Sequence, residues 1–400
     1  MTAGAFVGSF WPNERQKLLL RAALLEDERA AEAWHRLRLD FDVDALNLGE
    51  VRLLPLVYDR LRRLGIDDPA LPKLRGLYRR TWYLSQVLLD RLKEALRAVD
   101  ERDVEPLVVS SWELPVRYYR DLGLRAVEQL QLLVRPERVS GAARALSEAG
   151  WSGPLEPSEA FLRSRHSAPY EAENGDVCVV RWRLFHEYSV PGRVEPEDLF
   201  EPTTAFELGG VPARGLSPSD ELLDVCIGGA RMSHWPNLSW IPDALAVLRA
   251  PDTSVDWERL LIQARRLRAT LRIHDALAFL RHEFECHVPE DVLEKLRSTP
   301  SRRRELLAHK VAARRFGPLG PMPHTITRFL RLTADESVPR ALAELPEFLR
   351  DEWGLERRAQ IPSAAVRRAV GMVFAAARVA KAKRDRRTEQ AARAAAARES

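Results

Sequence analysis

The sequence predicts an α+β fold that is predominantly helical, with a small α/β core and a mixed sheet flanked by N- and C-terminal helical regions. Strong helix formers dominate the first hundred residues and return after residue 216. Short apolar runs typical of strands fall between these two stretches. The predicted organisation is a helical region over 1–100, the α/β core over 101–215, a helical domain over 216–350 and a basic Ala/Arg-rich helix or tail over 351–400.

The N-terminal region is predicted to be helical throughout. Its helices cover Glu14–Ala31, Glu50–Leu64 and Pro69–Val99, which are rich in Leu, Ala, Arg and Glu. In the third of these, leucines recur at three- and four-residue steps from Leu84 to Leu96. That spacing places them in one stripe, which is typical of a helix with a single apolar face.

The centre of the chain combines strands with shorter helices. Its apolar runs are short, partly alternating and bounded by turn residues, which favours strands. The predicted strands are Val104–Val109, Val127–Val134, Asp176–Phe185 and a shorter Ala205–Leu208. The helices predicted between them are Trp112–Tyr119 and Pro136–Gly150, the second ending at a glycine cap.

From residue 217 the chain is predicted to be helical again. Ser217 is a suitable N-cap, and Pro218 suits the first helical position. The stretch Gly317–Pro323 (GPLGPMP) is predicted to be a loop, and a long Ala/Arg helix is predicted after Ile361. The other predicted helices are 218–232, 239–249, 254–267, 269–284, 289–298, 301–314 and 338–350.

Composition favours a soluble protein of a reducing compartment. Of the 400 residues, 46% are hydrophobic and 30% are charged, and no apolar run reaches the length of a membrane span. The first residues do not resemble a signal peptide. Three widely spaced cysteines, Cys178, Cys226 and Cys286, provide neither a disulfide framework nor a zinc motif. We therefore expect a cytoplasmic protein with no membrane partner.

The net charge of +4 has a local origin. The stretch 378–400 holds eight basic and three acidic residues, so the remainder of the chain carries −1. A nucleic-acid partner for this tail is one interpretation, and a solvated Ala-rich helix is the favoured one, because no aromatic residue follows Phe374 for base stacking. The basic residues that would make the contact are Lys381, Lys383, Arg384, Arg386 and Arg387.

Several short segments in the centre of the chain form a recognisable pattern with others that flank them. The central segments are Pro106–Leu114 (PLVVSSWEL), Tyr119–Arg125 (YRDLGLR), Val127–Val134 (VEQLQLLV) and Arg181–Phe185 (RWRLF). The outlying segments are Arg52–Tyr58 (RLLPLVY), Leu74–Trp82 (LRGLYRRTW) and Trp235–Asp243 (WPNLSWIPD). Together they resemble the uncharacterised bacterial nucleotidyltransferase-like family, a branch of the nucleotidyltransferase superfamily. The resemblance spans roughly residues 15–300 and is most specific in the centre of the chain.

The resemblance implies transfer of a nucleoside monophosphate from an NTP to an acceptor, with divalent metal held by carboxylates. Family members place two aspartates at i and i+2 of one strand, and a third carboxylate on a neighbouring strand. In this sequence those positions fall on Gln129, Gln131 and Val179. The glycine-containing phosphate turn falls on Ser110 and Ser111. None of the three metal-binding carboxylates is therefore present where the resemblance places it.

The prediction is a catalytically degenerate nucleotidyltransferase that acts as a binding, regulatory or scaffold partner. No cofactor is expected, a protein or peptide partner is expected, and a nucleotide remains a possible ligand. For Gln129 and Gln131 two interpretations carry equal weight: a retained pocket that binds a ligand without metal, and a polar surface left after activity was lost. Arg125 is interpreted either as a cleft residue or as a surface residue. The candidate ligand-pocket residues are Ser110, Ser111, Glu113, Arg125, Gln129, Gln131 and Arg181.

The main alternative is an active enzyme with relocated metal ligands. It would use magnesium and an NTP to modify a protein, peptide or small-molecule acceptor. The carboxylates available to it are Glu113, Glu128, Glu156, Glu159, Glu171 and Glu173.

Two further motifs favour structural roles. The stretch His282–His287 (HEFECH) resembles a metal cluster but lacks zinc-protease order, so a helix end is the favoured interpretation. His234, Trp235 and the segment Trp240–Asp243 are expected to pack helices together.

Overall fold

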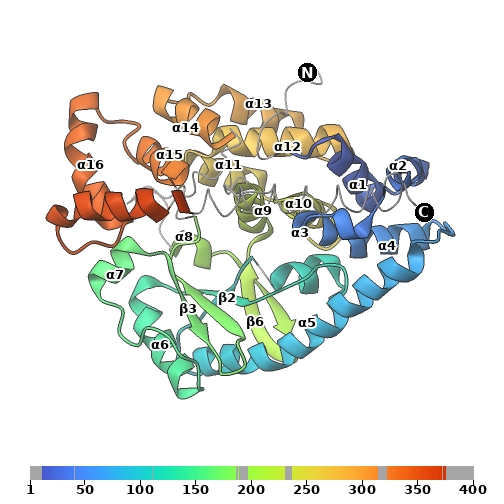
Figure 1. The fold of residues 1–400 in the computed structure, drawn as a ribbon, viewed down its shortest axis with the longest axis horizontal. Helices are drawn as coiled ribbons and strands as arrows, with labels where there is room; N and C mark the ends of the chain where they lie inside the picture. Colours follow the sequence, from blue (N-terminus) through green and yellow to red (C-terminus); the bar gives the residue numbers. More distant parts are fainter. Residues whose placement is uncertain are drawn as a thin grey trace, which may run out of the picture.

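The computed structural model describes residues 11–39, 41–110, 112–185, 188, 197–229, 237–313, 322–371 and 373–374. Within these ranges the protein is a predominantly helical α+β fold built on one six-stranded mixed sheet. Figure 1 shows α5 and α6 along one side of the sheet, and the N-terminal and C-terminal helices together on the other. The fold class predicted from the sequence is confirmed.

The described sheet has the strand order β3-β4-β2-β1-β6-β5. Strand β2 runs parallel to β4, and β1 runs parallel to β6, while the other neighbouring pairs are antiparallel. The strands are β1 (Leu107–Val108), β2 (Leu130–Leu133), β3 (Ser167–Glu171), β4 (Val177–Arg181), β5 (Thr203–Leu208) and β6 (Val211–Leu216).

The two faces of the sheet belong to different cores. Val108, Leu130 and Val180 belong to one buried cluster together with residues of α5 (Leu71–Asp100) and α6 (Val139–Glu148). Leu107 and Leu133 belong to the larger cluster formed with the N- and C-terminal helices. Because side chains alternate along a strand, residues in register with Leu133 face these helices. The functional side chains described below lie on that second face.

The N-terminal helices cover the second face from one side. The single helix expected over Glu14–Ala31 is interrupted, because Asp27 caps a new helix by accepting a hydrogen bond from the backbone N–H of Arg29. The helix expected over Glu50–Leu64 is also two helices. The elements before α5 are α1 (Glu14–Leu24), α2 (Glu28–Arg38), η1 (Val43–Ala45), α3 (Leu48–Val51) and α4 (Leu54–Arg63).

The C-terminal helices complete the cover. Ser217 caps the first of them, as predicted, and accepts a hydrogen bond from the N–H of Asp220. The loop predicted over Gly317–Pro323 is too long at its end, because a helix starts at Met322. Residues 314–321 lie outside the described residues. The helices are α9 (Pro218–Gly228), α10 (Trp240–Arg249), α11 (Trp257–Arg266), α12 (Thr270–Phe284), α13 (Glu290–Ser298), α14 (Arg303–Ala313), α15 (Met322–Leu332) and α16 (Val338–Glu352).

Two strands were not predicted. Strand β3 contains Pro169, and β6 contains Pro212 and Gly215, residue types that are depleted in strands. Antiparallel pairing with β4 and β5 supplies the hydrogen bonds that local propensity does not favour. The remaining short elements are η2 (Leu114–Tyr119), η3 (Pro136–Arg138), α7 (Glu159–Ser164), α8 (Glu197–Phe200) and η4 (Arg358–Gln360).

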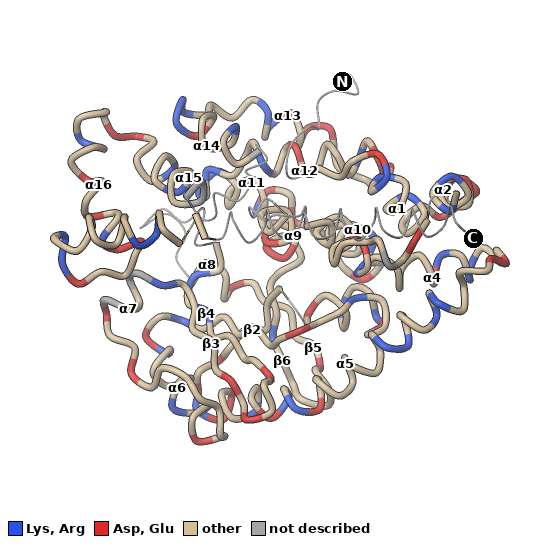
Figure 2. Tube along the Cα trace, viewed as in Figure 1, with Lys and Arg blue, Asp and Glu red and all other residues tan. Residues whose placement is uncertain are grey.

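Charged residues of both signs are interspersed over the described part of the chain (Figure 2). Among the described helices, none is long and apolar enough to cross a membrane. The basic tail over 378–400 lies outside the described residues, as do His234 and Trp235.

Candidate functional site

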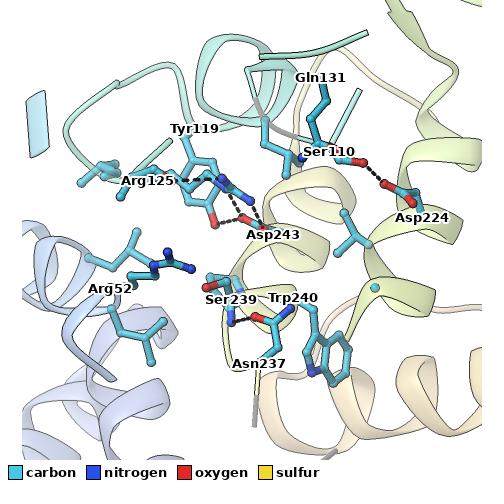
Figure 3. Close-up of a pocket in the computed structure, with 18 residues that line it drawn as sticks. Arg52, Ser110, Tyr119, Arg125, Gln131, Asp224, Asn237, Ser239, Trp240 and Asp243 are labelled. Carbon is cyan, nitrogen blue, oxygen red and sulfur yellow. Dashed lines mark hydrogen bonds and ion pairs between the residues drawn. The ribbon is translucent and has the colours of Figure 1, made fainter. Parts of the chain in front are cut away.

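A cavity of about 270 Å³ lies where the sheet meets both helical regions. The central fold contributes Ser110, Leu114, Tyr119, Leu124, Arg125, Ala126 and Gln131 (Figure 3). The N-terminal region contributes Arg52, Leu53 and Leu56. The C-terminal region contributes residues of α9 and of α10 with the turn before it: Asp224, Val225, Gly228, Asn237, Ser239, Trp240, Pro242 and Asp243. The cavity is therefore lined by all three parts of the chain.

Ser110 occupies the turn after β1 in a conformation that favours glycine. Its φ is +56°, in the left-handed region that L side chains adopt at a cost. Its hydroxyl donates a hydrogen bond to Oδ2 of Asp224 on α9. The serine side chain thus joins the core to the C-terminal helices at the wall of the cavity. Ser111, the other predicted residue of this turn, lies outside the described residues.

Gln131 and Val179 are neighbours across parallel strands. The register of β2 and β4 pairs Gln131 with Val179 and Leu133 with Arg181. The guanidinium Nη1 of Arg181, a residue only 5% exposed, donates to Oε1 of Gln131 over 2.7 Å. The sheet therefore has an amide, an aliphatic side chain and a buried cation on this face, where a metal centre would need carboxylates.

Gln129 lies just before β2 and is half-buried. It is two residues from Gln131, but it does not line the cavity. The adjacent Glu128 forms an ion pair with Arg52, and its side chain is 69% exposed. The structure therefore places Gln131, Ser110 and Arg125 at the cavity but not Gln129.

Arg125 lines the cavity and is bound to a carboxylate on α10. Its Nε lies 3.1 Å from Oδ1 of Asp243, and its Nη2 lies 2.9 Å from Oδ2. The hydroxyl of Tyr119 donates to the same Oδ1 over 2.8 Å. Burial and the Asp243 charge both raise the pKa of Tyr119, so its hydroxyl stays protonated and donates. This network fixes one wall of the cavity.

Glu113 is buried beneath the site rather than inside it. It is fully buried, forms an ion pair with Arg117 and accepts a hydrogen bond from the N–H of Leu216. A Cβ added at Gly215 would lie 2.4 Å from this carboxylate, so β6 passes close to Glu113 because residue 215 is glycine. Glu113 does not line the cavity.

None of the three acidic residues of α9 (Asp220, Glu221 and Asp224) was predicted as a site residue from the sequence. Asp224 is 4% exposed, and its Oδ1 has no hydrogen-bond partner. Glu221, one turn earlier, is fully buried with neither carboxylate oxygen hydrogen-bonded. Burial and the nearby Asp224 charge raise the pKa of Glu221 to about 8. These acids share one face of α9, the pattern of a solvent-exposed polar face, so nothing in the sequence indicated that the fold buries them.

The relocated ligands proposed for an active enzyme do not meet at the cavity. Glu156, Glu159, Glu171 and Glu173 are all exposed, and none of them lines it. In the part of the chain that the structure describes, no three His, Cys, Asp or Glu side chains form a group able to hold a metal ion. In the His282–His287 stretch, α12 ends at Phe284 and Cys286 is buried, which is the geometry of a helix end.

A family model described as "Uncharacterised nucleotidyltransferase" matches residues 48–299. The match covers more than half of the chain and includes every lining residue of the cavity. The chain belongs to this nucleotidyltransferase family. The resemblance read from the sequence is thereby confirmed.

Other comparisons are more distant. A solved nucleotidyltransferase-like protein, an antigen of Paracoccidioides brasiliensis, is 13% identical and aligns with a TM-score of 0.32. That alignment covers 56% of this chain and 94% of the other. No curated protein is significantly similar to this chain.

The residues of this family member do not fit the metal that the family chemistry implies. Magnesium prefers several hard oxygen ligands, usually including carboxylates. Here the strand positions hold Gln131 and Val179, and the guanidinium of Arg181 lies against the Gln131 oxygen. A fixed positive charge beside that oxygen repels a divalent cation. The carboxylates that do line the cavity, Asp224 and Asp243, are bound by Ser110 and Arg125.

Proposed function

We propose that this family member is catalytically degenerate and acts as a binding or regulatory protein through a metal-free cavity. The observation that carries the proposal is the guanidinium of Arg181 on the amide of Gln131, opposite Val179. The metal-directed charges of the family are replaced at this point by a neutral pair and a cation. The cavity itself is kept, and polar groups from three parts of the chain line it.

The test is isothermal titration calorimetry with ATP, GTP, CTP and UTP, each with and without magnesium. We expect no magnesium-dependent increase in the affinity for any of the four, because no group of carboxylates within the described residues is arranged to hold the metal. A radiolabel transfer assay on the same protein is expected to show no nucleotidyl transfer. Magnesium-dependent binding accompanied by transfer to any acceptor would overturn the proposal and favour the active alternative.

A protein or peptide partner is the second part of the proposal. Residues 361–371 are helical, and Val366, Val370 and Val373 are 63%, 48% and 68% exposed. Their four- and three-residue spacing forms an apolar stripe, and such stripes mark interaction surfaces. The Val366→Asp/Val370→Asp variant is expected to lose partners that crosslink to the wild type, without a change in Tm. Retention of the same crosslinked partners would contradict this part.

A further inference from the structure

The cavity has an acidic end and a basic end (Figure 3). Asp224 and Ser110 lie together at one end, and Arg52 lies at the other. Between them, Arg125 and Asp243 neutralise each other. The cavity therefore presents two separated, opposite charges to whatever occupies it.

At the acidic end of the cavity, one carboxylate oxygen has no hydrogen-bond donor. One oxygen of Asp224 accepts from Ser110, while Oδ1 is buried with no hydrogen-bond partner. An unsatisfied buried carboxylate oxygen is unfavourable, and a charged N–H donor is its strongest partner.

At the basic end, the partner of Arg52 can be replaced by a ligand anion. Arg52 is 34% exposed and pairs with Glu128, whose side chain is 69% exposed. Exposed ion pairs contribute little, because solvent screens them. A ligand anion held inside the cavity can therefore replace Glu128 on the guanidinium, which binds carboxylate and phosphate groups in a bidentate manner.

The size of the cavity limits the ligand. At about 270 Å³ it lies just below the range of roughly 300–1,000 Å³ found for drug-sized ligands. Its lining combines polar groups of Gln131 and Ser239 with the apolar Leu53 and Trp240. Such a lining suits a molecule of the size of one amino acid better than a nucleoside triphosphate.

We propose that the cavity binds a small zwitterion, with its ammonium group at Asp224 and Ser110 and its carboxylate or phosphate at Arg52. This inference deepens the proposed function and rests on its metal-free cavity. The ammonium group would donate to Oδ1 of Asp224, and the anion would take the place of Glu128 on Arg52.

The test is calorimetry on the full chain with the twenty L-amino acids and O-phosphoethanolamine. We expect at least one of them to bind. Binding of an amino acid would indicate a carboxylate at Arg52, whereas binding of O-phosphoethanolamine would indicate a phosphate. N-acetylation, which removes the ammonium, and conversion of the acid to its amide, which removes the anion, are each expected to weaken binding at least tenfold. Failure of every probe to bind, or equal affinity of the N-acetyl form, would overturn the inference.

Matched variants locate the two ends. Asp224→Asn is expected to weaken binding of the zwitterion at least tenfold, whereas Asp252→Asn, at an exposed carboxylate outside the cavity, is expected to leave it unchanged. If Asp224→Asn does not fold, Arg52→Gln is tested on its own. It should weaken binding of the zwitterion but not binding of its amide. Unchanged affinity in the folded variants would overturn the inference. Magnesium-dependent nucleotidyl transfer would instead overturn the proposed function, so the two failures are distinguishable.

Discussion

Ser110 combines an unfavourable backbone conformation with a favourable side-chain contact. Its φ of +56° suits glycine, and its hydroxyl satisfies one oxygen of Asp224. Ser110→Ala keeps the strained backbone and loses the hydrogen bond, so it should lower the free energy of unfolding by about 1–3 kcal/mol. Ser110→Gly also loses the bond but relieves the backbone, so it should be about 1 kcal/mol more stable than the alanine variant. Urea unfolding measures both, and an alanine variant at least as stable as the glycine variant would contradict this.

Glu221 is the residue whose protonation should most affect stability. Its pKa is raised to about 8 by burial and by Asp224, whereas a carboxyl group in the unfolded chain has its ordinary value near 4.5. Between these values the folded state holds a proton that the unfolded state has released, so the free energy of unfolding falls as the pH rises from about 4.5 to 8. Each unit of pKa difference is equivalent to about 1.4 kcal/mol.

Glu221→Gln should remove that fall. The variant is therefore expected to gain stability relative to the wild type as the pH is raised from 5 to 8.5. Urea unfolding at several pH values measures the difference, with Glu207→Gln at an exposed site on β5 as the control. Parallel pH profiles for wild type and Glu221→Gln would show that Glu221 is not held protonated by the fold.

At the scale of elements, the packing of β6 against η2 depends on Gly215. Alanine at this position would force its Cβ to within 2.4 Å of the Glu113 carboxylate and displace it from Arg117 and from the Leu216 N–H. Disruption of a buried ion pair is expected to lower the free energy of unfolding by about 3 kcal/mol or more. Gly76→Ala, in α5 with open space around it, is expected to be neutral or slightly stabilising. Chemical denaturation of both variants is the measurement, and equal stabilities would contradict the account.

The sequence patterns predicted the elements that carry strong local signals. Strand β2 and helix α9 have clear apolar patterns and caps, so they were recognised close to their true bounds. Strand β6 was missed, because Pro212 and Gly215 disfavour a strand until β5 and β1 pair with it. β5 adjoins it across the Gly209–Gly210 turn, but its other partner, β1, is distant in the sequence, and local propensity does not register such pairing.

The candidate site was only partly predictable for the same reason. Gln131 and Ser110 follow from the motif that resembles the family, and both line the cavity. Asp224 reaches the site from α9, more than a hundred residues after Ser110, and only the tertiary packing brings them together. A pattern along the chain identifies residues of one element, whereas a cavity between three regions depends on how those regions pack.

At the scale of the whole molecule, Asp243 ties the core to the C-terminal helices. Its two oxygens hold Arg125 and Tyr119 from the segment between β1 and β2. Asp243→Ala would leave the guanidinium of Arg125 buried without its anion, which is expected to lower the free energy of unfolding by about 3–5 kcal/mol. Asp243→Asn keeps a hydrogen-bond acceptor and should lose less. Urea unfolding followed by tryptophan fluorescence measures both, and an alanine variant as stable as the asparagine variant would contradict this role.

We propose that this protein lacks the metal chemistry of the family, because its carboxylate positions carry neutral side chains and an adjacent cation. Manganese reports this directly, since its paramagnetic resonance signal falls when it binds to protein. We predict that the wild-type protein leaves the signal of the Mn²⁺–ATP mixture unchanged. The Gln129→Asp/Gln131→Asp/Val179→Asp variant, as the matched comparison, is expected to bind more of the metal. Saturable binding of Mn²⁺ by the wild-type protein in the presence of ATP would contradict the claim.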